Sequence, residues 1–121
     1  KHEFESRQGD NYIKLDGSKE HGFSPKALLL AGLAGCSGID VVDILEKMRV
    51  KFSHFEIETE ATQTDDHPKV FRDVLITYKI NTDKENEEKV RKAIDLSLEK
   101  YCGVSAMLRK NSPVNYKLVI E

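Results

Sequence analysis

The residues best suited to chemistry in this sequence are its two cysteines, Cys36 and Cys102, which lie 66 positions apart (102 − 36). Cys36 sits within AGLAGCSGID, a stretch of small residues, and Cys102 within KYCGVS. Two thiols that meet in a fold can exchange electrons by forming a disulfide. The plainer interpretation is that each cysteine is a small buried apolar residue. The two cysteines are consistent with a redox pair, and both interpretations stay open at this point.

Cys102 carries one further signal, because it lies just before a predicted short helix over residues 104–110. Free N–H groups and the positive end of the helix dipole favour a thiolate at such a position. The four histidines are dispersed, and no Cys or His spacing resembles a zinc site, so we expect no metal centre. A Cys-His nucleophile pair stays open, although the sequence nominates no particular histidine.

The elements that must position these cysteines follow from periodicity and turn residues. Alternating patterns predict strands, and 3.6-residue patterns with a Ser24-Pro25 start predict helices. The order β-β-α-β-β-α-α-β predicts an α+β fold with antiparallel sheets, in one domain over residues 1–121. The expected segments are strands at 2–6, 11–16, 54–61, 70–80 and 114–120, and helices from 25 to about 49, over 83–101 and over 104–110.

The first helix is unusually rich in small residues, with Gly32, Gly35 and Gly38 beside alanines. An interior glycine costs about 1 kcal/mol of helix stability relative to alanine, so something must compensate. We expect another backbone to press closely on this helix, either a second helix or the same helix of a partner chain. The first half, apolar nearly all round, should be buried on most sides, with Cys36 at the close approach.

Composition restricts the possible functions. The chain has 121 residues with a net charge of −2, so it shows no basic surface for nucleic acid. The longest apolar run, Ala27–Cys36, is far shorter than the roughly 20 residues that span a bilayer, and we expect no membrane segment. Two cysteines are too few for a secreted disulfide scaffold, and no signal peptide is visible, which favours the cytoplasm.

The stretch SPKALLLAGLAGCSGIDVV, followed by HPKVF and then AIDLSLEKYCGVSAML, resembles the OsmC/Ohr family, and most closely its YhfA-like branch. The resemblance runs from about Asp16 to the C-terminus. Its most specific parts are a cysteine eleven residues after the helix-start proline and a second one in a Tyr-Cys-x-Val-Ser context. The resemblance implies the OsmC-like fold, an intertwined homodimer and a thiol-dependent peroxidase that responds to oxidative stress.

By position, the resemblance makes Cys36 the peroxidatic cysteine and Cys102 the resolving one, with an external dithiol as reductant and no metal or organic cofactor. In the family an arginine of the N-terminal hairpin activates the cysteine, held by a glutamate just after the helix-start proline. Arg7 resembles that arginine, while a solvated hairpin arginine is the alternative. Lys26 and Ala27 stand where the glutamate would be, so this arrangement is not reproduced. Asp40 shares the helix face of Cys36, four residues on.

The preferred hypothesis is therefore a cytoplasmic dimeric oxidoreductase that reduces organic hydroperoxides through Cys36 and Cys102. Leu29, Leu33 and Met107 are expected to line Cys36 and to favour lipophilic hydroperoxides over hydrogen peroxide. The missing glutamate motivates an alternative, a non-catalytic small-molecule binding or redox-sensing protein on the same fold. A third possibility keeps both thiols as inert core residues.

Overall fold

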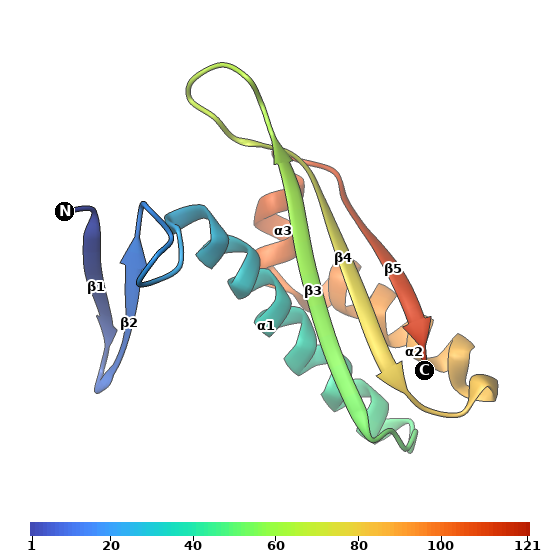
Figure 1. Ribbon diagram of the computed structural model, residues 1–121. Helices are drawn as coiled ribbons and strands as arrows, with labels where there is room; N and C mark the ends of the chain where they lie inside the picture. Colours follow the sequence, from blue (N-terminus) through green and yellow to red (C-terminus); the bar gives the residue numbers. More distant parts are fainter. The chain divides into compact units, whose positions relative to one another are not determined.

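The computed structural model describes residues 1–121 and divides them into two compact units, Lys1–Gly32 and Leu33–Glu121. The single domain expected over 1–121 stays a prediction. In the first unit, strands β1 (Glu3–Gln8) and β2 (Asn11–Asp16) form the predicted antiparallel hairpin (Figure 1). Gly9 turns it with φ +60, a conformation that glycine adopts at little cost.

The loop after β2 is organised by a buried carboxylate, Asp16. It accepts hydrogen bonds from the hydroxyl and backbone N–H of Ser18 and from the backbone N–H groups of Glu20 and His21. The Ser18 hydroxyl and these N–H groups hold the pKa of Asp16 well below its usual range. Asp16 therefore acts as a structural anchor of the turn.

Helix α1 (Pro25–Lys47) begins as predicted, since the Ser24 hydroxyl accepts a hydrogen bond from the Ala27 N–H at 3.3 Å. Its buried residues recur every fourth position and so form one face: Leu33, Ser37, Val41 and Leu45. The expectation that its first half is buried on most sides is wrong within one chain. Leu29 in that half is 50% exposed, and Leu33 is its one buried residue.

α1 is also long and apolar enough, by length and composition alone, to cross a membrane. Core helices of globular proteins and signal sequences pass the same test. The one buried polar residue on its inner face, Ser37, is hydrogen-bonded to Tyr78 of β4 and Ser97 of η2.

The second unit contains a three-stranded sheet in the order β3-β4-β5, with strands β3 (His54–Gln63), β4 (Phe71–Asn81) and β5 (Val114–Ile120). β3 and β4 form the predicted antiparallel hairpin. The prediction of purely antiparallel sheets is wrong, because β5 pairs parallel with β4. Between them the chain crosses over through helical segments, as a parallel pair requires: η1 (Lys84–Asn86), α2 (Glu87–Leu96), the π-helical turn η2 (Ser97–Tyr101) and α3 (Gly103–Arg109).

The core of the second unit lies between this sheet and the helices on one of its faces (Figure 1). Alternate residues of the central strand β4 are fully buried, including Ile76 and Tyr78, and α2 contributes Val90 and Ile94. A regular helix over residues 83–101 would place Tyr101 on the face of Val90 and Ile94, but Tyr101 is 55% exposed. The π-helical turn accounts for the difference, because its wider spacing rotates the residues that follow.

The small residues of α1 have unequal surroundings. A Cβ atom added at Gly38 would lie 3.1 Å from Ile57 Cδ1, so the close neighbour within the chain is a side chain of β3 and not the second helix that was expected. Gly32 and Gly35 have open space around them within the chain. Their exposed side of α1 is thus available to another molecule.

Candidate functional site

The two cysteines meet, although they lie 66 positions apart (102 − 36). The sulfur atoms of Cys36 and Cys102 and a carboxylate oxygen of Asp40 all lie within 4.8 Å of one another. Both cysteines are free thiols. Cys36 and Asp40 share one face of α1, as their spacing predicts, and Cys102 comes from the start of α3. The cluster lies entirely within the second unit.

Cys102 is held as the N-cap of α3, where its sulfur accepts a hydrogen bond from the Ser105 N–H at 3.3 Å. The predicted helix-terminus position is thus confirmed, but the predicted preference for a thiolate is wrong. Burial, with a smaller contribution from the neighbouring Cys36, raises the pKa of the Cys102 thiol to about 11, although the Ser105 and Val104 N–H groups act to lower it. Because only 2% of the surface of Cys102 is exposed, the effect of desolvation on its pKa outweighs the effect of the helix terminus.

Asp40 is fixed by a chain of buried hydroxyl groups that runs back to the sheet. Tyr78 Oη lies 2.6 Å from Ser37 Oγ, which lies 2.9 Å from Ser97 Oγ, and Ser97 Oγ lies 3.0 Å from Asp40 Oδ2. An ionised carboxylate only accepts hydrogen bonds, so the Ser97 hydroxyl donates its single proton to Asp40 Oδ2. Ser37 then donates to Ser97, and Tyr78 to Ser37. Three aligned hydroxyl dipoles thereby stabilise the carboxylate.

This hydroxyl chain was missed by sequence reasoning. Its signal is a serine in the middle of an otherwise apolar buried face, as Ser37 is between Leu33 and Val41. A buried hydroxyl needs a partner, so such a serine indicates a polar contact across the core. Tyr78 shows how dry the region is, because burial raises its pKa to about 12.

Arg7, the third predicted site residue, lies on β1 in the first unit. Its Nε donates a hydrogen bond to Glu5 Oε2 at 2.9 Å, and its guanidinium lies 5.7 Å from the ring centre of Tyr12. These contacts stiffen the hairpin. Its predicted role toward Cys36 stays a prediction.

The apolar residues predicted to line Cys36 differ in exposure. Leu33 is fully buried, whereas Leu29 and Met107 are 50% and 66% exposed. Leu33 therefore belongs to the core of the second unit. The exposed Met107 and Leu29 have their side chains available to a ligand or to another chain.

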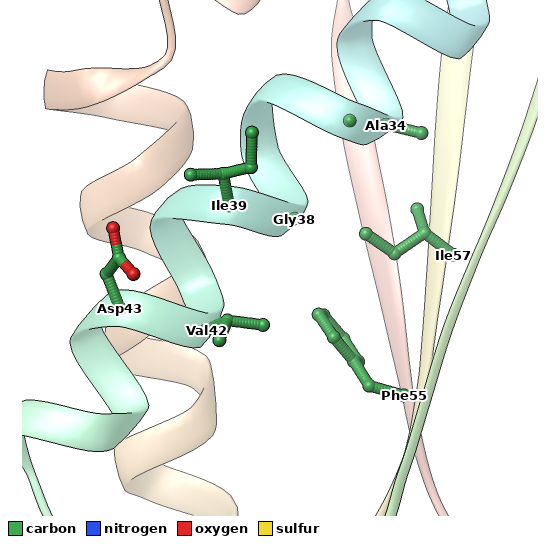
Figure 2. A pocket seen from close by; sticks show the side chains of 8 residues that line it. Ala34, Gly38, Ile39, Val42, Asp43, Phe55 and Ile57 are labelled. Carbon is green, nitrogen blue, oxygen red and sulfur yellow. The ribbon is translucent and has the colours of Figure 1, made fainter.

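An open apolar groove of about 530 Å³ runs between α1 and β3, on the outer side of the small residues. Figure 2 shows Phe55 and Ile57 of β3 reaching toward the turn of α1 that carries Gly38 and Val42. The groove is lined by Ala34, Gly35, Gly38, Ile39, Val42, Asp43, Phe55 and Ile57. Its lining begins two residues before Cys36 in the chain, at Ala34, and is largely hydrocarbon and glycine backbone.

Comparison with known proteins agrees with the predicted resemblance. The family model described as OsmC-like protein matches residues 16–117. Protein YhfA of Escherichia coli K12 is 32% identical over 117 residues, which cover 95% of this chain and 87% of YhfA. A crystal structure of a hypothetical protein from Aquifex aeolicus has a TM-score of 0.83 at 28% identity, covering 99% of this chain and 89% of that one.

The organic hydroperoxide resistance protein OhrB of Bacillus subtilis shares the fold at a lower identity, 20%, with a TM-score of 0.62 over 96% of this chain and 95% of OhrB. Both structures share the α+β fold of the present chain. The family match extends over most of the sequence and includes both cysteines. The chain therefore belongs to the OsmC-like protein family.

Proposed function

We propose that this protein is a thiol-dependent peroxidase that reduces organic hydroperoxides in the cytoplasm during oxidative stress. The observation that carries the proposal is the meeting of Cys36 and Cys102 with Asp40 within 4.8 Å. Two thiols that are distant in sequence but this close in space are positioned to form a disulfide. Cysteines that serve only as inert core residues would not have to lie next to each other. The fold shared with an organic hydroperoxide resistance protein supports the same reaction class.

In the proposed reaction the Cys36 thiolate attacks one oxygen of the peroxide O–O bond. The bond breaks, the alkoxide leaves and takes a proton to become the alcohol, and Cys36 becomes a sulfenic acid. The Cys102 sulfur then displaces hydroxide from the Cys36 sulfur, which gives a disulfide and, after protonation, water. An external dithiol reduces the disulfide by exchange. These steps use no bound metal or organic cofactor.

The two cysteines suit the two steps differently. Cys36 is half-buried and so reachable from solvent, whereas Cys102 is almost fully buried behind it. With its pKa raised to about 11, Cys102 stays a thiol at neutral pH and does not compete for the peroxide. Arg7, which resembles the family's arginine, is proposed as the cation that activates Cys36, without the glutamate that holds the arginine in the family.

The proposal includes a homodimer in which a second copy covers the apolar groove between α1 and β3. Ile39 is 66% exposed on this side, and Gly35 leaves open space beside it. Small residues on an exposed helix face let a second helix approach closely. The partner chain would then complete the wall beside Cys36, which favours lipophilic hydroperoxides over hydrogen peroxide.

A second candidate function is a redox-sensing or small-molecule binding protein. Two observations favour it: Lys26 and Ala27 replace the glutamate of the family, and the high pKa of Cys102 slows disulfide formation at neutral pH. A slow thiol pair suits a sensor better than an enzyme that turns over. A bound apolar ligand in the purified protein, with negligible turnover, would support this candidate.

The deciding experiment treats the reduced protein with one equivalent of cumene hydroperoxide, traps free thiols at intervals and measures masses. We expect rapid loss of two hydrogens and a peptide pair linked through Cys36 and Cys102. The Cys36→Ser variant should keep a free Cys102, and Cys102→Ser should stop at the Cys36 sulfenic acid. The same experiment with hydrogen peroxide should run more slowly.

Serine is a suitable replacement at position 102, because its hydroxyl can keep the cap on the Ser105 N–H. Loss of reaction in this variant therefore reports on chemistry, with the fold checked by circular dichroism. Two thiols that stay free for hours in the wild-type protein would contradict the peroxidase proposal. Equal rates with both peroxides would contradict the proposed preference for lipophilic substrates.

A further inference from the structure

The cluster that holds the two cysteines contains three atoms that suit a transition metal ion. The sulfurs of Cys36 and Cys102 and one carboxylate oxygen of Asp40 lie within 4.8 Å of one another. Donor atoms around tetrahedral zinc, at about 2.0–2.3 Å from the metal, are separated from one another by roughly 3.3–3.8 Å. Small side-chain rotations would bring the three atoms to that spacing. The i, i+4 spacing placed Cys36 and Asp40 on one helix face and the resemblance paired Cys36 with Cys102, but no Cys or His spacing in the sequence indicated a metal site.

The surroundings of the three donors also suit an ion. Asp40 is oriented by the Ser97 hydroxyl at 3.0 Å, and Cys102 by the Ser105 N–H at 3.3 Å. Partners of this kind hold metal ligands in place in known sites. Asp40 also lines a second groove, of about 470 Å³, between α1 and α2. Asp40 is the donor of the three that lines this groove, together with Lys47 and Lys92, so the carboxylate would be the first donor that an ion meets from this side.

Charge favours a cation at this place. Two thiolates and a carboxylate supply three negative charges to a bound cation. A thiol that coordinates a divalent ion is deprotonated outright. Two thiolates and one carboxylate leave the fourth tetrahedral position to water. Soft sulfur donors select zinc and related ions over magnesium or calcium.

We propose that the reduced protein binds one Zn²⁺ ion per chain through Cys36, Cys102 and Asp40, and that the bound ion keeps both sulfurs from reacting with peroxides. The binding site stands on the donor geometry, while its regulatory consequence rests on the proposed peroxidase function. Zinc here is a reversible inhibitor that takes no part in turnover. Formation of the Cys36–Cys102 disulfide removes two of the three donors, so the oxidised protein does not bind the ion.

The test uses Co²⁺ as a spectroscopic probe for the reduced full-length protein. We expect sulfur-to-cobalt charge-transfer absorption that saturates at one Co²⁺ per chain and disappears when Zn²⁺ is added. Cys36→Ser and Cys102→Ser should each abolish the two-thiolate spectrum, and Asp40→Asn should weaken Zn²⁺ binding at least tenfold. Glu46→Gln, which alters an exposed carboxylate on the same helix that lines neither groove, is the matched control and should bind as the wild type does. The chemically oxidised protein should show no absorption.

A second measurement separates the site from the proposed function. Saturating Zn²⁺ should slow the loss of free thiols to cumene hydroperoxide at least tenfold, and a chelator should restore the rate. A protein that forms the disulfide with peroxide but shows no thiolate–cobalt absorption overturns this inference and leaves the peroxidase proposal intact. Thiolate–cobalt absorption in a protein that peroxide does not oxidise supports the site and overturns the peroxidase proposal, and with it the inhibitory role. Binding that survives Cys102→Ser unchanged overturns the assigned donor set.

Discussion

The two sides of α1 differ in their contacts with the rest of the second unit. The inner side carries Leu33, Ser37, Val41 and Leu45, all buried, and a hydroxyl chain that ties the helix to β4 and η2. The outer side carries Gly35 and Ile39, with open space or solvent around them. Cys36 lies between the two sides, half-buried. The inner side stabilises the fold of the chain, whereas the outer side exposes apolar surface that another molecule can contact.

The largest contrast between the sides should come from large-to-small substitutions. Leu45→Ala removes a fully buried side chain and should lower the free energy of unfolding by about 2–5 kcal/mol at any protein concentration. Ile39→Ala removes a side chain that is 66% exposed. Its effect should be within about 0.5 kcal/mol in the dilute protein and should grow with concentration as dimers form. Urea unfolding at several concentrations measures both, and equal costs for the two variants would contradict the contrast.

The free energy of unfolding should also fall at alkaline pH, because of two ionisable groups buried on the inner side of α1, Cys102 and Tyr78. The pKa of Cys102 is about 11 in the folded chain against an ordinary 9.0, so the unfolded chain loses this proton first. Stability from this group is therefore complete below pH 9 and is lost as the pH rises from 9 to 11, by at most about 3 kcal/mol. Tyr78, with its pKa raised to about 12, acts in the same direction at higher pH.

Urea unfolding of the reduced protein at pH 8, 9 and 10 measures this loss. Cys102→Ser should lose less stability over the same range, because serine does not ionise there. A variant that follows the wild-type curve would show that another group dominates the alkaline response.

A smaller effect should follow from breaking the hydroxyl chain. Ser37→Ala leaves the buried Tyr78 and Ser97 hydroxyls each short of a partner, which should cost about 1–3 kcal/mol. Adding Tyr78→Phe should cost less in this background than in the wild type, since the tyrosine has already lost its partner. A double-mutant cycle by urea unfolding measures the coupling. Fully additive costs would mean that the contact contributes nothing.

The smallest change in stability should come from the glycines. Gly35→Ala has open space and gains up to about 1 kcal/mol of helix propensity in the isolated chain. The same methyl group should weaken the dimer if a second copy packs there. Gly38→Ala is the comparison, because its Cβ meets Ile57 Cδ1 at 3.1 Å and the gain is offset. Sedimentation together with urea unfolding separates the two effects, and a Gly35→Ala protein that dimerises like the wild type would remove this side of α1 from the interface.

Much of the fold was predictable because its signals are local. The alternation at Phe55 and Ile57 and the Ser24-Pro25 start each specify an element without reference to the rest of the chain. The parallel pairing of β5 with β4 was not predictable in this way, since strand direction depends on where the crossover helices deliver the chain. The exposure of Tyr101 was missed for a similar reason, because a π-helical turn leaves no clear pattern in the sequence.

The candidate site was predictable in part. The spacing of Cys36 and Asp40 is enough to place both on one helix face, and the family resemblance pointed to Cys102. The balance of forces on Cys102 was not predictable, because the helix terminus can be anticipated from sequence while the degree of burial cannot. The serine-to-serine contact across the core, from Ser37 to Ser97, likewise depends on packing that only the structure shows.

The meeting of Cys36 with Cys102 also has a topological meaning. A bond between the two sulfurs would close a loop of 66 positions (102 − 36) that contains β3, β4 and α2. By the chain-entropy estimate, closing a loop of that size disfavours the unfolded chain by about 4 kcal/mol. Because folding and disulfide formation are linked in one thermodynamic cycle, the same difference of about 4 kcal/mol means that folding raises the equilibrium constant for forming this disulfide about a thousandfold. Reduction of the disulfide by a cellular dithiol would therefore lower the free energy of unfolding of the second unit. The stability of this unit would depend on the redox state of the two sulfur atoms.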